Sequence, residues 1–135
     1  MESSDDRTLR FDRYLRALAA LEEVLQDTPS VPASILRDSR IQRFAFTFET
    51  LWKFLRVAAE HAGVDADTPR GALRAALQIG LLDPADESDA WQLIRYRNLT
   101  VHTYDEALSC EVECFIVNTA IHLFRKIAAR GSSGA

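Results

Sequence analysis

The chain has 135 residues, and 16 Lys and Arg against 20 Asp and Glu give a net charge of −4. A chain with this net charge has no overall positive field to attract nucleic acid. Any contact with nucleic acid must therefore come from a local basic patch. With 47% hydrophobic residues and only five Gly and four Pro, the composition also excludes a disordered or turn-rich protein. The length predicts a single domain over residues 1–135, with loose tails at 1–6 and 131–135.

The hydropathy pattern indicates no membrane-spanning helix. No apolar run approaches the roughly 18 residues that such a helix needs. The first ten residues are acidic and polar, unlike a signal sequence. We therefore expect a soluble, cytoplasmic protein with no membrane partner.

The first element is predicted as a helix. Apolar residues recur at spacings of three and four along residues 11–25, which indicates a helix over about 6–27. Pro29 and Pro32 follow, and proline lacks a backbone donor and disfavours helix in the residue before it. A connector is therefore expected at these prolines.

The second element is predicted as the longest and most aromatic helix, from about Ser39 to near Gly63. Three aromatic residues widen its apolar stripe, which is wider than one bundle seam requires. The stripe is therefore either interior or dimer surface. Its apolar residues are Ile41, Phe44, Phe48, Leu51, Leu55, Ala58 and Ala62, with Phe46, Trp52 and Phe54 beside them.

Start and stop signals delimit the next two helices. Thr68-Pro69 combines an N-cap with proline at the first helical position, and Gly80 supplies a left-handed stop. Asp83-Pro84 repeats the start signal, and the helix after it is expected to run to about residue 100.

The final helix is predicted to begin near Thr103 or Asp105 and to continue through Ile127. Thr103-x-x-Glu106 fits a capping box. No alternating run of strand length is present in the sequence. The predicted fold class is all-α, an antiparallel up-and-down bundle of four long helices plus one short helix.

The two cysteines, Cys110 and Cys114, lie four residues apart on this helix and share a face. We expect both to be buried as small apolar side chains. A disulfide between successive turns would close almost no loop entropy. Only His122 is nearby as a further metal ligand, so no metal site is predicted.

The junction before the final helix carries the polar sequence RNLTVHTYDE, residues 97–106. In a regular helix Arg97 and His102 would be rotated by about 140° from one another and would not share a face. The β-branched residues Thr100, Val101 and Thr103 are poor helix formers. A helix that loosens after about Thr100 would let His102 swing back over the helix end.

Arg97 and His102 have the chemistry of a metal-independent ribonuclease. Arginine presents a fixed fork of donors that matches a phosphate. Histidine both takes and gives a proton near neutral pH. Chemically, His102 is suited to activate a ribose 2′-hydroxyl or to protonate the leaving oxygen, while Arg97 stabilises the phosphorane. A structural helix end, with Arg97 paired to an acidic neighbour and His102 bonded to a carbonyl, explains the same spacing.

The junction is one part of a longer pattern of residues, which extends in chain order from roughly Ile41 to Ile127. Its residues are Arg43, Phe44, Phe48 and Glu49 with Trp52 and Lys53, then Thr68, Pro69 and Arg70, then Trp91, then Arg-Asn-x3-His-x-Tyr at 97–104. Together they resemble the HEPN superfamily, specifically its HepT branch, also described as nucleotidyltransferase substrate-binding proteins. No departure from the motif is visible.

This resemblance implies a two-fold homodimer of HEPN-type bundles in which the Arg-x4-His segments of both protomers line one cleft. It implies a toxin that cleaves RNA without metal or cofactor, and a minimal nucleotidyltransferase (MNT) partner as antitoxin. Carried over residue by residue, Arg97 and His102 are the catalytic pair and Asn98 is the polar residue within the motif. Tyr104 is the tyrosine that accepts AMP from ATP.

Tyr104 has a physical rationale in that role, because a nucleotidyl group beside His102 would block RNA by bulk and by like charge. The alternative is a half-buried aromatic residue that packs on the last helix. Further RNA contacts are expected from Arg95, Tyr96, Arg70 and Arg74. Trp52 and Trp91 are expected in the core rather than as stacking platforms.

Two other functions remain open at this point. The first is a non-catalytic subunit that binds substrate for its nucleotidyltransferase partner, which the older description of the family favours. The second is a purely structural bundle whose motif is a remnant.

Overall fold

The computed structural model describes residues 2–102 and 104–133, and these residues form helices and short connections, with no strand among them. Helices α5, η3 and α6 follow one another without a break, so the described residues form five helical rods. In chain order the elements are α1 (Glu2–Leu25), α2 (Ala33–His61), α3 (Pro69–Ile79), η1 (Pro84–Asp86), α4 (Glu87–Leu99), η2 (Thr100–His102), α5 (Glu106–Phe115), η3 (Ile116–Ala120) and α6 (Ile121–Ser133). The predicted all-α class is confirmed.

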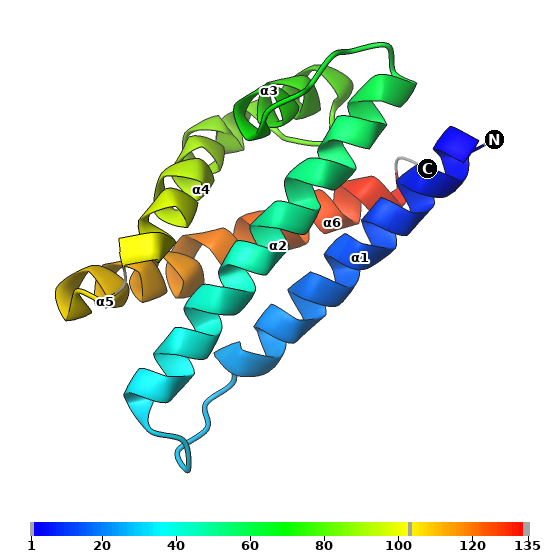
Figure 1. Ribbon diagram of the computed structural model, residues 1–135. Coiled ribbons are helices and arrows are strands. Elements are labelled where there is room, and N and C mark those ends of the chain that lie inside the picture. Colours follow the sequence, from blue (N-terminus) through cyan, green and yellow to red (C-terminus); the bar gives the residue numbers. More distant parts are fainter. Residues whose placement is uncertain (1, 103, 134–135) are drawn as a thin grey trace.

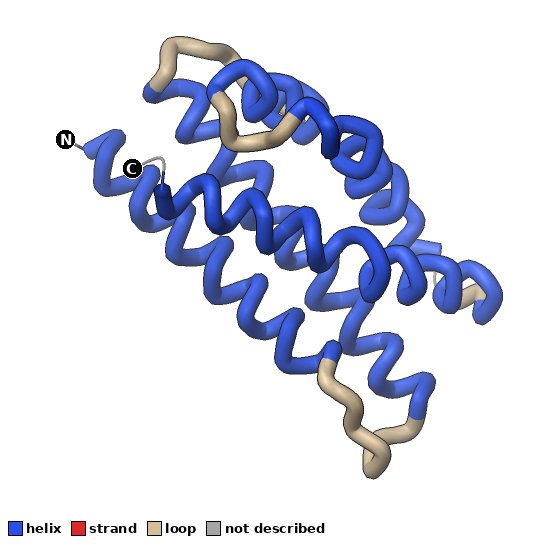
Figure 2. The backbone as a smooth tube through the Cα atoms, turned by 180° about the vertical axis from the view of Figure 1, so that it is seen from behind, coloured by secondary structure: helices blue, strands red, loops and turns tan. Residues whose placement is uncertain are grey.

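The two longest α-helices, α1 and α2, run antiparallel along their length and form the long hairpin of the molecule (Figure 1). The rod made of α5, η3 and α6 crosses behind this hairpin, as the view from behind shows (Figure 2). Helix α5 contacts α2 and α4, whereas α6 contacts α1. Helix α3 lies at the far end of α2, and α4 leads from it to the start of α5 (Figure 1).

The core lies between α1, α2 and the last rod, and α3 and α4 add buried side chains to it. The predicted stripe of α2 is buried at Phe44, Phe48 and Leu51, which confirms it as interior. Each such side chain stabilises the fold by about 1.5–3 kcal/mol when fully buried. Phe46 lies on the opposite side of α2 and is 60% exposed. Trp52 and Trp91 are partly buried and pack against the core, as predicted.

Tyr14 of α1 brings a polar atom into this core. Its side chain has no exposed surface, and its hydroxyl donates a hydrogen bond to the carbonyl oxygen of Phe124 at 2.6 Å. Burial raises the pKa of the Tyr14 phenol well above its ordinary value of 10.0. The bond ties the middle of α1 to α6.

Two helix starts differ from the prediction. Helix α2 begins at Ala33 rather than near Ser39, and its first turn is bonded to the carbonyl oxygen of Pro32. Ile35 in this turn is 56% exposed, so the segment lacks the apolar periodicity that marks a buried helix. Helix α1 begins at Glu2, and α6 includes residues 131–133, so the expected tails are largely helical.

The predicted signals around α3 are confirmed. The Thr68 hydroxyl accepts a hydrogen bond from the backbone N–H of Gly71 at 3.0 Å. Gly80 ends the helix with a φ of 83°, which favours glycine. Asp83 then accepts a hydrogen bond from the N–H of Ala85 at 2.9 Å and starts η1.

The last rod departs from the prediction in two respects. Its middle, η3, is π-helical rather than α-helical. Cys110 and Cys114 are exposed rather than buried, because Ser109 and Val112 occupy the inward face of α5. The sulfur of Cys114 accepts a hydrogen bond from the Asn118 side chain at 3.1 Å.

The last rod is the most apolar helix of the described residues by length and composition. Residues Glu106–Ser132 form a helix that is long and apolar enough to cross a membrane by length and composition alone. A core helix of a helical bundle passes the same test, and this rod supplies Ile116, Ile121 and Phe124 to the buried core.

Candidate functional site

The candidate site is the junction between α4 and α5, where the helix loosens as predicted. Helix α4 ends at Leu99, and residues Thr100–His102 form a 3-10 turn. The Thr100 hydroxyl donates a hydrogen bond to the carbonyl oxygen of Arg97 at 2.6 Å, which satisfies a carbonyl group of the last helical turn. The next helix begins after Asp105, whose carboxylate accepts a hydrogen bond from the N–H of Leu108 at 3.2 Å. The capping-box residue Thr103 lies outside the described residues.

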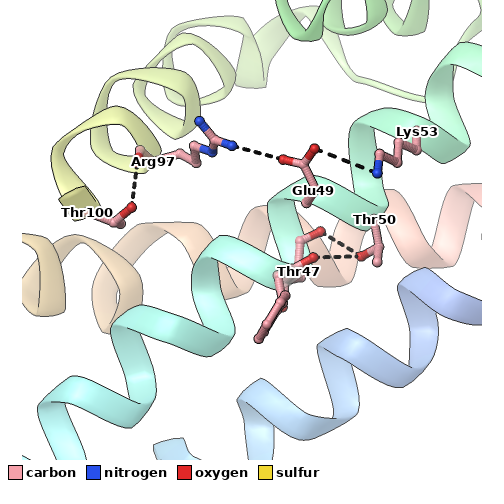
Figure 3. A network of polar contacts seen from close by, with 7 residues as sticks. Thr47, Glu49, Thr50, Lys53, Arg97 and Thr100 are labelled. Carbon is pink, nitrogen blue, oxygen red and sulfur yellow. Dashed lines mark hydrogen bonds and ion pairs between the residues drawn. The ribbon is translucent and has the colours of Figure 1, made fainter.

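Arg97 points from the last turn of α4 toward the middle of α2 (Figure 3). Its Nη2 atom lies 3.1 Å from Oε2 of Glu49, and the two side chains are 42% and 34% exposed. This contact is the acidic pairing that the structural alternative predicted for Arg97.

Glu49 also approaches a second cation. Its Oε1 atom lies 3.8 Å from Nζ of Lys53, one helical turn further along α2 (Figure 3). Pairs this exposed are each worth at most about 1 kcal/mol. The carboxylate therefore lies between two cations that it holds weakly, and both are within reach of an incoming anion.

His102 and Tyr104 lie on the solvent side of the junction. His102 is exposed at the end of η2, and the two ring centroids are 6.2 Å apart in an edge-to-face arrangement. Tyr104 is 88% exposed, so the alternative of a half-buried packing residue is wrong. Its hydroxyl is sterically open to another protein.

Within one chain, the described contacts do not join Arg97 to His102. The arginine is paired with Glu49, and the recorded ring contact of the histidine is with Tyr104. Asn98 is exposed beside them. The catalytic roles of Arg97 and His102 and the supporting role of Asn98 stay predictions.

The expected RNA contacts on α4 are engaged with neighbouring side chains. The Tyr96 ring stacks on Phe115 with centroids 4.2 Å apart, and its hydroxyl donates to Oε2 of Glu111 at 3.0 Å. Desolvation, followed by the bond to Glu111, raises the pKa of Tyr96. Arg95 lies over the Tyr96 ring at 5.3 Å and donates to the Gln92 side chain.

The expected RNA contacts on α3 lie on a different helix from Arg95 and Tyr96. Arg70 lies over the Trp91 ring at 5.3 Å, and the indole N–H donates to Oε2 of Glu87 at 3.2 Å. Arg74 is exposed. The four predicted contacts therefore come from two helices, α3 and α4, and their role in RNA binding stays a prediction.

Sequence reasoning did not identify Glu49 as the partner of Arg97. The spacing of Glu49 and Lys53 predicts their i, i+4 contact, but no local pattern relates either residue to α4.

Within the described residues, no cluster of three His, Cys, Asp or Glu side chains is suited to a metal ion.

The fold and the site define an all-helical bundle that displays an Arg-x4-His-x-Tyr junction between two helices. Residues 9–131 match the family described as nucleotidyltransferase substrate binding protein like, and the chain belongs to this family. The resemblance to the HepT branch is thereby confirmed, and the family implies association with a nucleotidyltransferase.

A crystal structure of a protein from Thermus thermophilus has a similar fold, with a TM-score of 0.77 and 33% sequence identity. The similarity covers 87% of this chain and 98% of that chain. No curated protein matches the sequence.

Proposed function

We propose that this protein is a metal-independent endoribonuclease toxin that its nucleotidyltransferase partner neutralises by AMP transfer to Tyr104. The observation that carries this proposal is the junction itself. It exposes His102 and Tyr104 to solvent shortly after Arg97, whose guanidinium is paired with the partly exposed carboxylate of Glu49.

In the proposed reaction, His102 takes the proton of a ribose 2′-hydroxyl, and the 2′-oxygen attacks the adjacent phosphorus. The bond from phosphorus to the 5′-oxygen breaks, and that oxygen receives a proton from an imidazolium. The products are a 2′,3′-cyclic phosphate and a free 5′-hydroxyl. Arg97 stabilises the charge on the phosphorane oxygens. In a two-fold homodimer, the His102 side chains of two copies supply the base and the acid.

In the neutralising reaction, the Tyr104 oxygen attacks the α-phosphorus of ATP. The bond to the leaving pyrophosphate breaks, and the phenolic proton goes to a base of the nucleotidyltransferase. The adenylate then carries negative charge beside His102, where it repels an RNA phosphate and blocks its approach.

The test is cleavage of single-stranded RNA in the presence of a metal chelator. Arg97→Ala and His102→Ala are each expected to lower the rate by about 10²-fold or more, the lower end of what general acid-base and electrostatic catalysis contribute. Arg125→Ala is the matched control, because Arg125 is a half-exposed arginine of α6 that pairs with Glu22 at 3.4 Å. Equal rates in all four proteins would refute the ribonuclease proposal.

The ion pair between Arg97 and Glu49 favours a second candidate, a non-catalytic subunit that binds substrate for the nucleotidyltransferase. In that case Arg97 has a structural partner, and the exposed Tyr104 serves complex formation or transfer alone. Expression of the protein without its partner distinguishes the two functions. Growth arrest that requires His102 supports the toxin, and unaffected growth with intact RNA supports the subunit.

A further inference from the structure

A groove with an apolar floor and cationic side chains around it runs between α1 and α2, outside the motif. Two adjoining pockets form it, of about 380 Å³ and about 130 Å³. Arg13 of α1 and Thr50 of α2 line both pockets, so the two hollows are continuous. We call this surface the α1–α2 groove.

The charge of the α1–α2 groove is opposite to that of the whole protein. Among the described residues that line it, five are cationic and one, Glu49, is acidic, although the chain has a net charge of −4. The cations are Arg10, Arg13, Arg16, Arg43 and Lys53. This is the local basic patch that the global charge requires for any contact with nucleic acid.

Two of these cations, Arg13 and Arg16, are exposed to solvent. Arg16 is 81% exposed and pairs with Asp12 at 2.9 Å, within its own helix. Arg43 is held more firmly, because it donates a hydrogen bond to the carbonyl oxygen of Ala20 at 2.7 Å and contacts Glu23 at 3.8 Å. For Arg13, no hydrogen bond or ion pair is recorded with any other described residue. Solvated guanidinium groups of this kind exchange partners with a phosphate at small cost.

The larger pocket also contains an aromatic surface. Phe46 projects from α2 with 60% of its area exposed, between Arg43 and Thr50 in the sequence and beside Ala17 and Ala20 of α1. An exposed ring surrounded by arginines is the arrangement on which bases of single-stranded nucleic acid stack while the phosphates meet the cations.

The α1–α2 groove leads to Arg97. Glu49 lines the smaller pocket, and its carboxylate contacts Lys53 through one oxygen and Arg97 through the other (Figure 3). A phosphate that replaces this carboxylate would meet two cations, Lys53 of α2 and Arg97 of α4. The single acidic group of the groove thus lies at its junction with the motif.

From this arrangement we infer that the α1–α2 groove binds a single-stranded RNA segment and leads it to Arg97, with one base on Phe46 and phosphates on Arg13 and Arg16. This inference rests on the proposed ribonuclease function. Charge complementarity favours RNA over a second copy of the chain. A two-fold contact centred on the groove would place like charges face to face.

The test measures binding of a labelled single-stranded RNA by fluorescence anisotropy, with His102→Ala present in every protein to prevent cleavage. Arg13→Gln/Arg16→Gln is expected to weaken binding about tenfold and to reduce the salt slope by about 0.7 for each lost phosphate contact. Phe46→Ala is expected to weaken binding about fivefold or more through loss of stacking. Arg125→Gln replaces a half-exposed arginine of α6 outside the groove and the motif, so it is the matched control and should bind as the parent does.

The outcomes separate this inference from the ribonuclease proposal. Unchanged affinity in the groove variants, or an equal loss in Arg125→Gln, overturns the inference and leaves the cleavage assay to decide the activity. Selective loss in the groove variants supports the inference even where the protein with native His102 does not cleave. A Phe46→Ala variant that changes the oligomeric state in sedimentation without weakening RNA binding assigns the groove to a second copy and overturns the inference.

Discussion

Glu49 of α2 holds the guanidinium of Arg97 of α4 at 3.1 Å, so the charge that the proposed chemistry needs is partly neutralised in the free protein. Glu49→Gln removes this competitor. We expect affinity for single-stranded RNA to rise about 2- to 5-fold in the His102→Ala background, because the amide binds Arg97 less strongly than a carboxylate does. The free energy of unfolding should fall by less than about 1 kcal/mol, since the pair is partly exposed.

Anisotropy titration and urea unfolding measure these two effects. Glu60→Gln is the matched control, because Glu60 is exposed near the end of the same helix. Weaker binding in Glu49→Gln would contradict a competitive role for the carboxylate.

Tyr104→Phe should abolish the adenylate that mass spectrometry detects on the peptide around residue 104 after co-expression with the genomic neighbour. The transfer needs the phenolic oxygen, and Tyr104 offers it to solvent with 88% of its surface exposed. Stability should change by less than about 0.5 kcal/mol, as for other exposed positions. Tyr96→Phe, whose hydroxyl is bonded to Glu111, should remain modified. An adenylate that persists on the Tyr104→Phe protein would assign the modification to another residue.

Asp105→Ala should destabilise the protein by about 1 kcal/mol through loss of the N-cap of α5. The carboxylate accepts the N–H of Leu108 at 3.2 Å, and no such acceptor remains after the substitution. Asp105→Asn, which keeps an acceptor oxygen, should retain most of the stability. Chemical unfolding of the three proteins tests this, and equal midpoints for alanine and asparagine would show that the cap contributes nothing.

Tyr14→Phe should lower the free energy of unfolding by about 1–2 kcal/mol near neutral pH, because it removes a buried hydrogen bond to the Phe124 carbonyl. The pH dependence has a definite sign. The folded protein has a raised Tyr14 pKa, so above about pH 10 the unfolded state releases the proton more readily and stability falls with rising pH.

The Tyr14→Phe variant should therefore lose stability less steeply than the wild type between about pH 10 and 11. Thermal unfolding across that range measures the difference. Parallel curves for the two proteins would contradict the assigned cause.

The parts of the fold that could be predicted from the sequence are those with local signals. Thr68, Gly80 and Asp83 carry their capping chemistry in the residue itself, and the structure confirms each. The start of α2 lacks such a signal because Ile35 and its neighbours are exposed. The exposed cysteines were mispredicted because residue type indicates burial only on average.

The candidate site was predictable only in part for the same reason. The loosening after Leu99 follows from the β-branched residues beside it, and the structure confirms it. The pairing of Arg97 with Glu49 joins residues 48 positions apart, and the α1–α2 groove joins two helices. Such contacts depend on how the helices pack, which periodicity within one helix does not specify.

The π-helical turn at Ile116–Ala120 bears on how this chain tolerates changes in length. A π turn holds one more residue than an α turn, so it rotates everything after it by about 100° around the rod axis. Deleting one residue there would let the rod become uniformly α-helical. The half that packs on α1 and the half that packs on α2 and α4 would then be out of phase, and one of them would turn polar side chains inward.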